Sequence, residues 1–221
     1  MLKITSPYPY KEFKRKSVNG KRLYENPYGE PVPSVTTILS KTKDMTHLNA
    51  WKKRVGEKKA QEIVTEAANV GTVMHEILEA WSLNQEYTGK NLLQAKMMAE
   101  TVISNVEADI DEVWGSEVNL CFPGLYAGTT DLVGVYKGKP TIMDFKQTNK
   151  PKKREWIEDY FMQAAAYAMA HNEIFETKIE NAAIFMCSRD CDWQLFEIGP
   201  EEFAHWEEKW ASRVAEFYNL T

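Results

Sequence analysis

The stretch GTTDLVGVYKGKPTIMDFK, residues 128–146, decides the fold, because apolar residues alternate on both sides of a Lys-Gly-Lys-Pro turn. This pattern predicts two strands joined by a hairpin. Asp131 lies in the first strand, and Asp144 and Lys146 end the second. Because side chains alternate along a strand, Asp144 and Lys146 share one face, while Phe145 points into the core. Pairing of the two strands can bring Asp131 close to Asp144.

The segments around this hairpin predict an α/β fold. Ser34 is expected to cap a helix that begins at Val35. Further helices are expected, with a break at Gly71, over residues 46–68, 71–83, 91–113, 154–171 and from Pro200 onward. Strands are expected over residues 117–121, 126–136, 141–146, 181–188 and 193–198. One face of the last helix carries Phe203, Trp206, Trp210, Val214 and Phe217. The order predicts a mixed β-sheet core flanked by helices, with a helical N-terminal region beside it.

Length and composition predict one globular domain with an appended arm. The chain has 221 residues, of which 43% are hydrophobic and 27% charged, as in ordinary globular proteins. Residues 1–33 are expected to form a basic arm with at most a short hairpin around Asn19-Gly20, and residues 34–221 a single domain. No apolar stretch reaches the length of a membrane span, so no membrane association is expected. The N-terminus resembles neither a secretory signal nor a mitochondrial transit peptide, so a cytoplasmic location is expected.

The net charge of −5 is divided unevenly along the chain. Residues 1–60 hold 14 Lys and Arg against 5 Asp and Glu, whereas residues 61–221 hold 13 against 27. A second basic segment, residues 137–154, has seven Lys and Arg and one acidic residue, Asp144. Two basic surfaces on an acidic body can follow a phosphate backbone. Either segment alone is also what a solvated lysine face produces.

Two carboxylates and a lysine in an apolar sheet indicate a metal site. Asp131 and Asp144 would repel each other and lose hydration unless a cation lay between them. Oxygen ligands suit Mg²⁺ or Mn²⁺, so either ion is the expected cofactor. Lys146 can orient the attacking water or offset charge on a phosphate, although a surface ion pair is the alternative for an isolated Asp-x-Lys. His75, one helical turn before Glu79, can add a nitrogen ligand or be a hydrogen-bonded histidine at a polar helix edge.

Several residues outside this pair are candidate DNA contacts. Trp51 is followed by Lys52, Lys53 and Arg54, so a stacking ring adjoins positive charge, although core packing also explains Trp51. Lys150, Lys152 and Lys153 follow Lys146, where a phosphate chain would pass. Gln163 and Tyr167 share one face of the next helix and can hold the DNA backbone. Ser34 and Thr36, near the start of the first helix, can line a channel for single-stranded DNA. Ser34 can also be only the cap of that helix. These candidates are Lys150, Lys152, Lys153, Gln163, Tyr167, Ser34 and Thr36.

The order of these motifs resembles the RecB-type branch of the PD-(D/E)XK nuclease superfamily. The motifs are Gly71-x-x-x-His75, Asp131, Asp144-Phe-Lys146 and Gln163-x-x-x-Tyr167. A closer resemblance is to the mitochondrial genome maintenance exonucleases and their phage and bacterial relatives. It is carried by Pro33-Ser-Val-Thr-Thr-Ile-Leu39, Asp144-Phe-Lys-Gln-Thr-Asn-Lys-Pro151 and Gln163-Ala-Ala-Ala-Tyr167-Ala-Met-Ala-His171-Asn.

The resemblance implies a restriction-endonuclease-like core over residues 114–221, fed by a helical arch over residues 34–113. It implies an exonuclease acting on single-stranded DNA or single-stranded ends in replication, recombination or repair, in a bacterial or phage-infected cell. The implied metal ligands are His75, Asp131, Asp144 and the Phe145 carbonyl, with Lys146 catalytic.

Some assignments stay open beside this resemblance. Glu117 falls where the family often has an acidic residue, and we take it as a DNA-side contact. Gln147, directly after Lys146, departs from the family, where Thr is common at this position. A structure-specific or restriction-like endonuclease and a non-catalytic DNA-binding module are the alternatives. The three cysteines, Cys121, Cys187 and Cys191, are too few for an iron–sulfur cluster, so none is expected. The motifs give no indication of protein partners.

Overall fold

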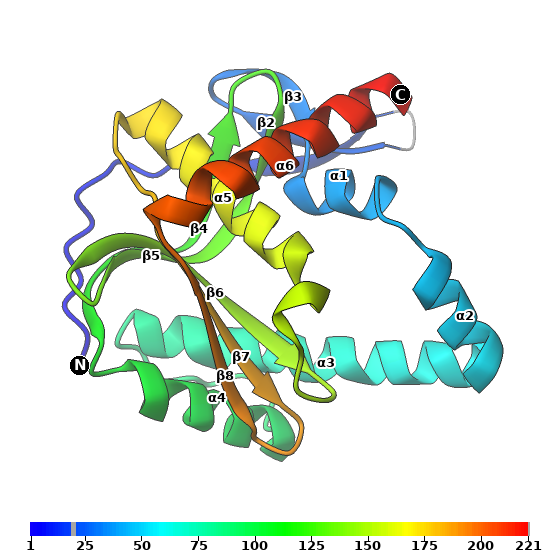
Figure 1. The fold of residues 1–221 in the computed structure, drawn as a ribbon. Coiled ribbons are helices and arrows are strands. Elements are labelled where there is room, and N and C mark those ends of the chain that lie inside the picture. Colours follow the sequence, from blue (N-terminus) through cyan, green and yellow to red (C-terminus); the bar gives the residue numbers. More distant parts are fainter. Residues whose placement is uncertain (19–20, 221) are drawn as a thin grey trace.

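The computed structural model describes residues 1–18 and 21–220, built around a five-stranded mixed sheet (Figure 1). The strand order is β4-β5-β6-β7-β8. Its strands are Ile110–Phe122 (β4), Tyr126–Tyr136 (β5), Lys139–Thr148 (β6), Ala182–Ser188 (β7) and Trp193–Ile198 (β8). Neighbouring strands are antiparallel except β6 and β7, which are parallel. The predicted β5 and β8 have the observed bounds.

Helices cover both faces of this sheet, as predicted. The helices α3 (Glu57–Ser82) and α4 (Leu93–Val106) lie on one face, and α5 (Glu158–Phe175) and α6 (Pro200–Leu220) lie on the other (Figure 1). The short helices α1 (Val35–Lys41) and η1 (Arg154–Trp156) complete the second layer. Alternation along β6 follows from this arrangement: Ile142 packs with α5, while Met143 and Phe145 pack with α3. The five apolar side chains predicted on one face of α6 are buried.

Residues 1–33 fold onto the body of the protein. They contain a three-stranded antiparallel sheet of β1 (Lys14–Val18), β2 (Lys21–Asn26) and β3 (Gly29–Pro33). Leu2 is buried, and Ile4 forms a bridge with Val113 of β4. The segment therefore holds more strand than the predicted single hairpin, whose turn at Asn19-Gly20 lies outside the described residues. The division of the chain at residue 33 stays a prediction.

The break between the two central helices was predicted at the wrong glycine. The helix α2 (Thr46–Val55) ends at Gly56, whose φ of 84° is in the left-handed region that glycine adopts without strain. The helix α3 then continues through Gly71. A glycine inside a helix costs about 1 kcal/mol, and burial of Val70 and Met74 on either side of Gly71 outweighs that cost.

The predicted helix over residues 91–113 was also too long. It ends at Val106, and β4 begins at Ile110. Pairing of Ile110 with Tyr136 and of Val113 with Gly134 on β5 gives this segment sheet hydrogen bonds, which override its helical pattern.

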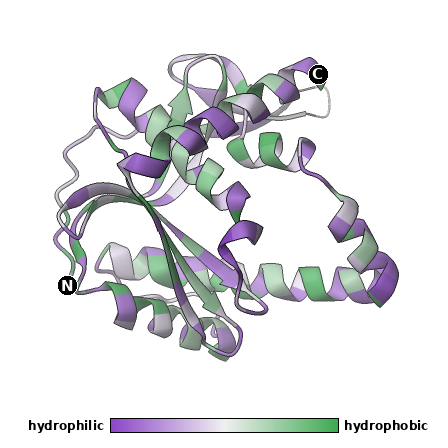
Figure 2. Ribbon diagram, viewed as in Figure 1, coloured by the Kyte–Doolittle hydropathy of each residue, from purple (hydrophilic) through white to green (hydrophobic). Residues whose placement is uncertain are grey.

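The helix α2 stands apart from the two layers. Figure 1 shows it joining α1 to α3 at the edge of the molecule, and every residue of α2 is at least partly exposed. In Figure 2 the corner where α2 meets α3 is hydrophilic. Among the described residues, no helix is both long and apolar enough to cross a membrane.

Candidate active site

The candidate site forms where two neighbouring strands stop pairing. The β5–β6 ladder ends at Leu132 and Met143, so Asp131 and Asp144 stand immediately beyond its last pair. From Asp144 onward β6 continues its parallel pairing with β7. Asp131 fills the opening, because its Oδ2 accepts a hydrogen bond of 2.7 Å from the Phe145 backbone N–H. In a strand the N–H and C=O of one residue point to the same side, so the Phe145 carbonyl also faces this opening.

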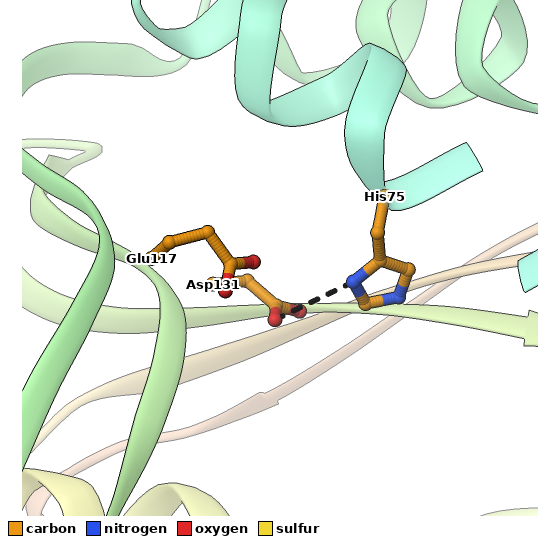
Figure 3. Close-up of side chains that lie close together, drawn as sticks. All are labelled: His75, Glu117 and Asp131. Carbon is orange, nitrogen blue, oxygen red and sulfur yellow. Dashed lines mark ion pairs between the residues drawn. The ribbon is translucent and has the colours of Figure 1, made fainter. Parts of the chain in front are cut away.

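Glu117 and His75 approach Asp131 from two other elements. Ser116 pairs with Leu132 and the residue after Glu117 pairs with the residue before Asp131, so Glu117 lies opposite Asp131 on the adjacent strand. His75 comes from α3, and its Nδ1 lies 3.5 Å from Asp131 Oδ1 (Figure 3). One ligand atom from each of the three residues lies within 4.8 Å of the other two. The split between β5 and β6 thus lets side chains from different layers meet.

The backbone of Glu117 is strained. Its φ of 50° is in the left-handed region, although Glu117 lies within β4. A non-glycine residue rarely adopts this conformation, and such residues concentrate at functional sites. Like charges directly opposite on paired strands also destabilise a sheet. Both costs are expected where a site must place carboxylates together.

Asp144 and Lys146 form a buried ion pair on the α5 side of β6. The Lys146 ammonium contacts Asp144 Oδ2, and the two side chains are 16% and 2% exposed. The other oxygen, Oδ1, is buried with no hydrogen-bond partner in the part of the chain that the structure describes. An unpartnered buried carboxylate oxygen is costly unless a cation or a ligand satisfies it.

Neighbouring carboxyl groups in this site have pKa values that move in opposite directions. Burial raises the pKa of Asp131, but the charge of His75 and its hydrogen bond outweigh burial and lower it to about 2. Burial raises the pKa of Asp144 to about 6, together with the charge of Asp131. Burial and the Asp131 charge likewise raise the pKa of Glu117 to about 7. Burial opposes the charged form of Lys146, but Asp144 and Asp131 outweigh it and raise the pKa, so Lys146 is a cation.

The donors present fit a small hard divalent cation. Carboxylate oxygens of Glu117 and Asp131 and one His75 ring nitrogen lie within 4.8 Å of one another, and Asp144 stands at the same split between β5 and β6 as Asp131. Mg²⁺ and Mn²⁺ prefer oxygen-rich sets of this kind. The unpartnered Asp144 Oδ1 is an atom that such an ion would satisfy. The charges of Asp131 and Asp144 outweigh burial at His75 and raise its pKa.

Tyr167 and Gln163 line the same region from α5. Tyr167 is buried, its hydroxyl lies 3.4 Å from Gln163 Nε2, and burial and then the charge of Asp144 raise its pKa. A Cβ added at Gly128 would lie 2.7 Å from the Tyr167 ring and 2.9 Å from its hydroxyl. The glycine that begins the Gly128-Thr-Thr-Asp131 motif therefore makes room for Tyr167.

The other predicted DNA contacts lie in two groups. Trp51 is partly exposed on α2, beside an exposed group that we call the α2 basic cluster: Lys52, Lys53 and Arg54. Lys150 and Lys153 are exposed in the loop after β6, where the backbone of Lys152 is held by Gln194 through hydrogen bonds of 2.7 and 2.8 Å.

Ser34 caps α1, as predicted. Its side chain accepts a hydrogen bond of 3.0 Å from the backbone N–H of Thr37, and the exposed Thr36 hydroxyl lies 3.0 Å from it. The cap accounts for Ser34 without a DNA contact.

Two features of the site escape the sequence patterns. Glu117, predicted as a DNA-side contact, has a carboxylate oxygen within 4.8 Å of ligand atoms of His75 and Asp131; the residues around Glu117 in the sequence carry no signal of a left-handed backbone. The Tyr160 ring lies 5.0 Å from the Lys146 ammonium. Its position three residues before Gln163, on the helix that follows the lysine, is the only sequence clue to that contact.

Sequence comparison supports a relationship to nucleases of the PD-(D/E)XK type, as the motifs predicted. Mitochondrial genome maintenance exonuclease 1 of Xenopus tropicalis is 27% identical over 200 residues, 84% of this chain and 57% of that protein. The human protein of the same name is 28% identical over 175 residues, 72% of this chain and 50% of that protein. The chain thus spans about half the length of these curated relatives.

Two further comparisons were made, with solved structures and with family models. A solved structure from Eubacterium rectale, provisionally named an exonuclease, aligns over 68% of both chains with 15% identity and a TM-score of 0.43. No family model matches the chain. The mixed sheet with helices on both faces is consistent with a restriction-endonuclease-like core.

Proposed function

We propose that this chain is a metal-dependent deoxyribonuclease, an exonuclease that hydrolyses phosphodiester bonds of single-stranded DNA or single-stranded DNA ends. The observation that carries the proposal is the cluster of Glu117, Asp131 and His75 at the split between β5 and β6, with the Asp144–Lys146 ion pair at the same split. Replication, recombination or repair is the corresponding process. The two exonuclease relatives support the same reaction class.

Each group of the site has a role in this reaction. Asp131, Asp144, Glu117 and His75 would hold Mg²⁺ or Mn²⁺, with the Phe145 carbonyl facing the same opening. When bound, the ion supplies a water of lowered pKa and an electrophile for the phosphate oxygen. Lys146 keeps a positive charge beside Asp144, where it stabilises the negative charge that develops on the phosphate.

The hydrogen bond from the Phe145 N–H orients Asp131. Because burial limits the movement of Asp131 and Asp144, their oxygens are preorganised before substrate binds. A preorganised site has less to reorder during the reaction, which favours catalysis over mere binding.

The basic surfaces support a nucleic-acid substrate. The α2 basic cluster adjoins the partly exposed ring of Trp51 on a helix that stands apart from the layers, and cations next to an aromatic ring suit single strands. We propose that α2 captures the strand and that Lys150, Lys152 and Lys153, which follow Lys146 along the chain, contact its phosphates.

Cleavage of labelled DNA tests this function. The protein is incubated with linear end-labelled and with circular single-stranded DNA, each with Mg²⁺ and with EDTA. We expect mononucleotides or short oligonucleotides from the linear strand with Mg²⁺ only. Cleavage of the circle would instead assign an endonuclease. Binding without cleavage of either substrate in Mg²⁺ or Mn²⁺ would assign a non-catalytic DNA-binding module and refute the proposal.

A further inference from the structure

The Lys146 side chain needs a second anchor besides Asp144. Its four-carbon chain is flexible, and its ammonium is a point charge that can turn in several directions. Asp144 Oδ2 contacts the ammonium, but Asp144 is also a proposed metal ligand. A carboxylate shared between a lysine and a metal ion holds each of them less firmly than it would hold one alone.

The ring of Tyr160 supplies a contact of the required kind. The Lys146 Nζ lies 5.0 Å from the ring centroid, within the range over which an ammonium is attracted to an aromatic face. The contact is also shielded from water, because the Lys146 side chain is only 16% exposed. Two other lysines lie over aromatic rings: Lys209 over Trp206 and Lys153 over Trp156. Their side chains are 36% and 67% exposed, so their contacts are open to water. Such attractions strengthen when water is excluded.

The ring is itself held in place by the start of α5. The Tyr160 N–H donates to Ile157 O at 2.9 Å, which fixes the first turn. Next to it, Asp159 is bound by Lys43 at 2.6 Å and by Arg213 at 3.4 Å. These pairs tie the turn that carries Tyr160 to the segment that follows α1 and to α6. A ring on a tethered turn can position a flexible lysine, whereas a ring on a mobile loop cannot.

We propose that Tyr160 is a positioning residue of this site: its ring holds the Lys146 ammonium at the place where the phosphate charge develops. The inference rests on the proposed nuclease function and goes beyond its metal ligands and lysine. The ring carries this role, because the Tyr160 hydroxyl has no hydrogen-bond partner among residues 1–18 and 21–220. A phenylalanine at this position therefore keeps the function, and an aliphatic residue loses it.

Three variants separate positioning from packing. Tyr160→Phe keeps the ring, and Tyr160→Leu removes it while keeping an apolar side chain. Tyr28→Leu is the matched control, because Lys11 lies 5.4 Å from the Tyr28 ring, and this ring packs against a separate cluster that contains none of the candidate metal ligands. Circular dichroism and urea unfolding establish that each variant is folded.

The first readout is kinetic. Single-turnover and steady-state cleavage of linear single-stranded DNA are measured with saturating Mg²⁺. We expect Tyr160→Leu to lower kcat about tenfold with little change in KM, and Tyr160→Phe to stay near the wild-type value. Tyr28→Leu should leave kcat unchanged. Equal losses in Tyr160→Phe and Tyr160→Leu, or a wild-type rate in folded Tyr160→Leu, would overturn the inference.

The second readout does not depend on cleavage. Lysines are reductively dimethylated with ¹³C-formaldehyde, and the Lys146 methyl signal is identified by its loss in Lys146→Arg. The ring should shift this signal upfield in the wild type and in Tyr160→Phe, and the shift should vanish in Tyr160→Leu. The same Lys146 shift in all three proteins would refute the contact. If the wild type cleaves no DNA, the proposed function fails, and this signal still decides whether Tyr160 holds Lys146.

Discussion

Glu117→Gln is expected to stabilise the metal-free protein while it weakens metal binding. The pKa of Glu117 is raised from 4.5 to about 7 by burial and by the charge of Asp131. For a fully buried group this shift corresponds to about 3 kcal/mol, and because Glu117 reaches solvent we expect about 1–2 kcal/mol. Gln keeps the size and hydrogen-bonding shape of Glu but cannot ionise, so it avoids this cost.

The sign of the pH dependence follows from the same shift. Between pH 4.5 and pH 7 the native protein binds more protons at Glu117 than the unfolded chain does, so this residue makes stability fall as pH rises. Glu117→Gln lacks this fall. In EDTA the variant should therefore exceed the wild type at pH 8, and the difference should close toward pH 4.5. Urea unfolding at a series of pH values measures it.

A control and a metal titration complete this test. Glu112→Gln, in the same strand, should have the opposite sign, because hydrogen bonds from Lys3 and Trp114 lower the pKa of Glu112. Mg²⁺ at a hundredfold excess over its dissociation constant should stabilise the wild type by about 2.7 kcal/mol and Glu117→Gln by less. A variant less stable than the wild type at pH 8 in EDTA, or a difference independent of pH, would refute the reasoning.

Four further outcomes are expected. Asp144→Asn should remain folded and cleave at least about a hundredfold more slowly; near-normal single-turnover rates would contradict its role. His75→Ala should raise the Mg²⁺ concentration needed for half-maximal cleavage without changing DNA affinity, as titration and fluorescence anisotropy would show. Replacing all three residues of the α2 basic cluster with alanine should weaken binding of single-stranded DNA and flatten the salt dependence of that binding; unchanged affinity and salt dependence would show that these cations are only a solvated helix face. Gly128→Ala should destabilise by about 1–3 kcal/mol, because the new Cβ meets Tyr167 at 2.7 Å; Gly128→Ala combined with Tyr167→Leu should lose less than the separate losses predict.

Most of the strands, and the hairpin that carries Asp131 and Asp144, could be predicted from the sequence. Alternation along residues 126–136 placed β5 correctly, and the same period put Asp144 and Lys146 on one face with Phe145 in the core. Because side chains alternate along β6, a shift of its register by one residue would move Asp144 and Lys146 from the α5 side of the sheet to the α3 side.

The failures come from contacts between distant segments. The sequence at the start of β4 has a helical pattern of apolar residues, and this segment is a strand because it pairs with β5. Gly71 predicts a break between helices, but α3 is continuous across Gly71 because the residues on either side pack against the sheet. The place of Glu117 depends on a left-handed backbone and on the register opposite Asp131, neither of which leaves a local pattern. Tyr160 meets Lys146 only because α5 crosses back over β6.

Single-turnover hydrolysis by Lys146→Ala tests the central claim most directly. Linear, end-labelled single-stranded DNA is mixed with excess protein and saturating Mg²⁺, and product formation is followed for the wild type and the variant. Binding of the DNA and the unfolding curve are measured on the same preparations. We expect cleavage by the wild type and a loss of at least about a hundredfold in the folded, DNA-binding variant. Equal rates in both proteins would contradict the assignment of this site as the place where the phosphodiester is cut.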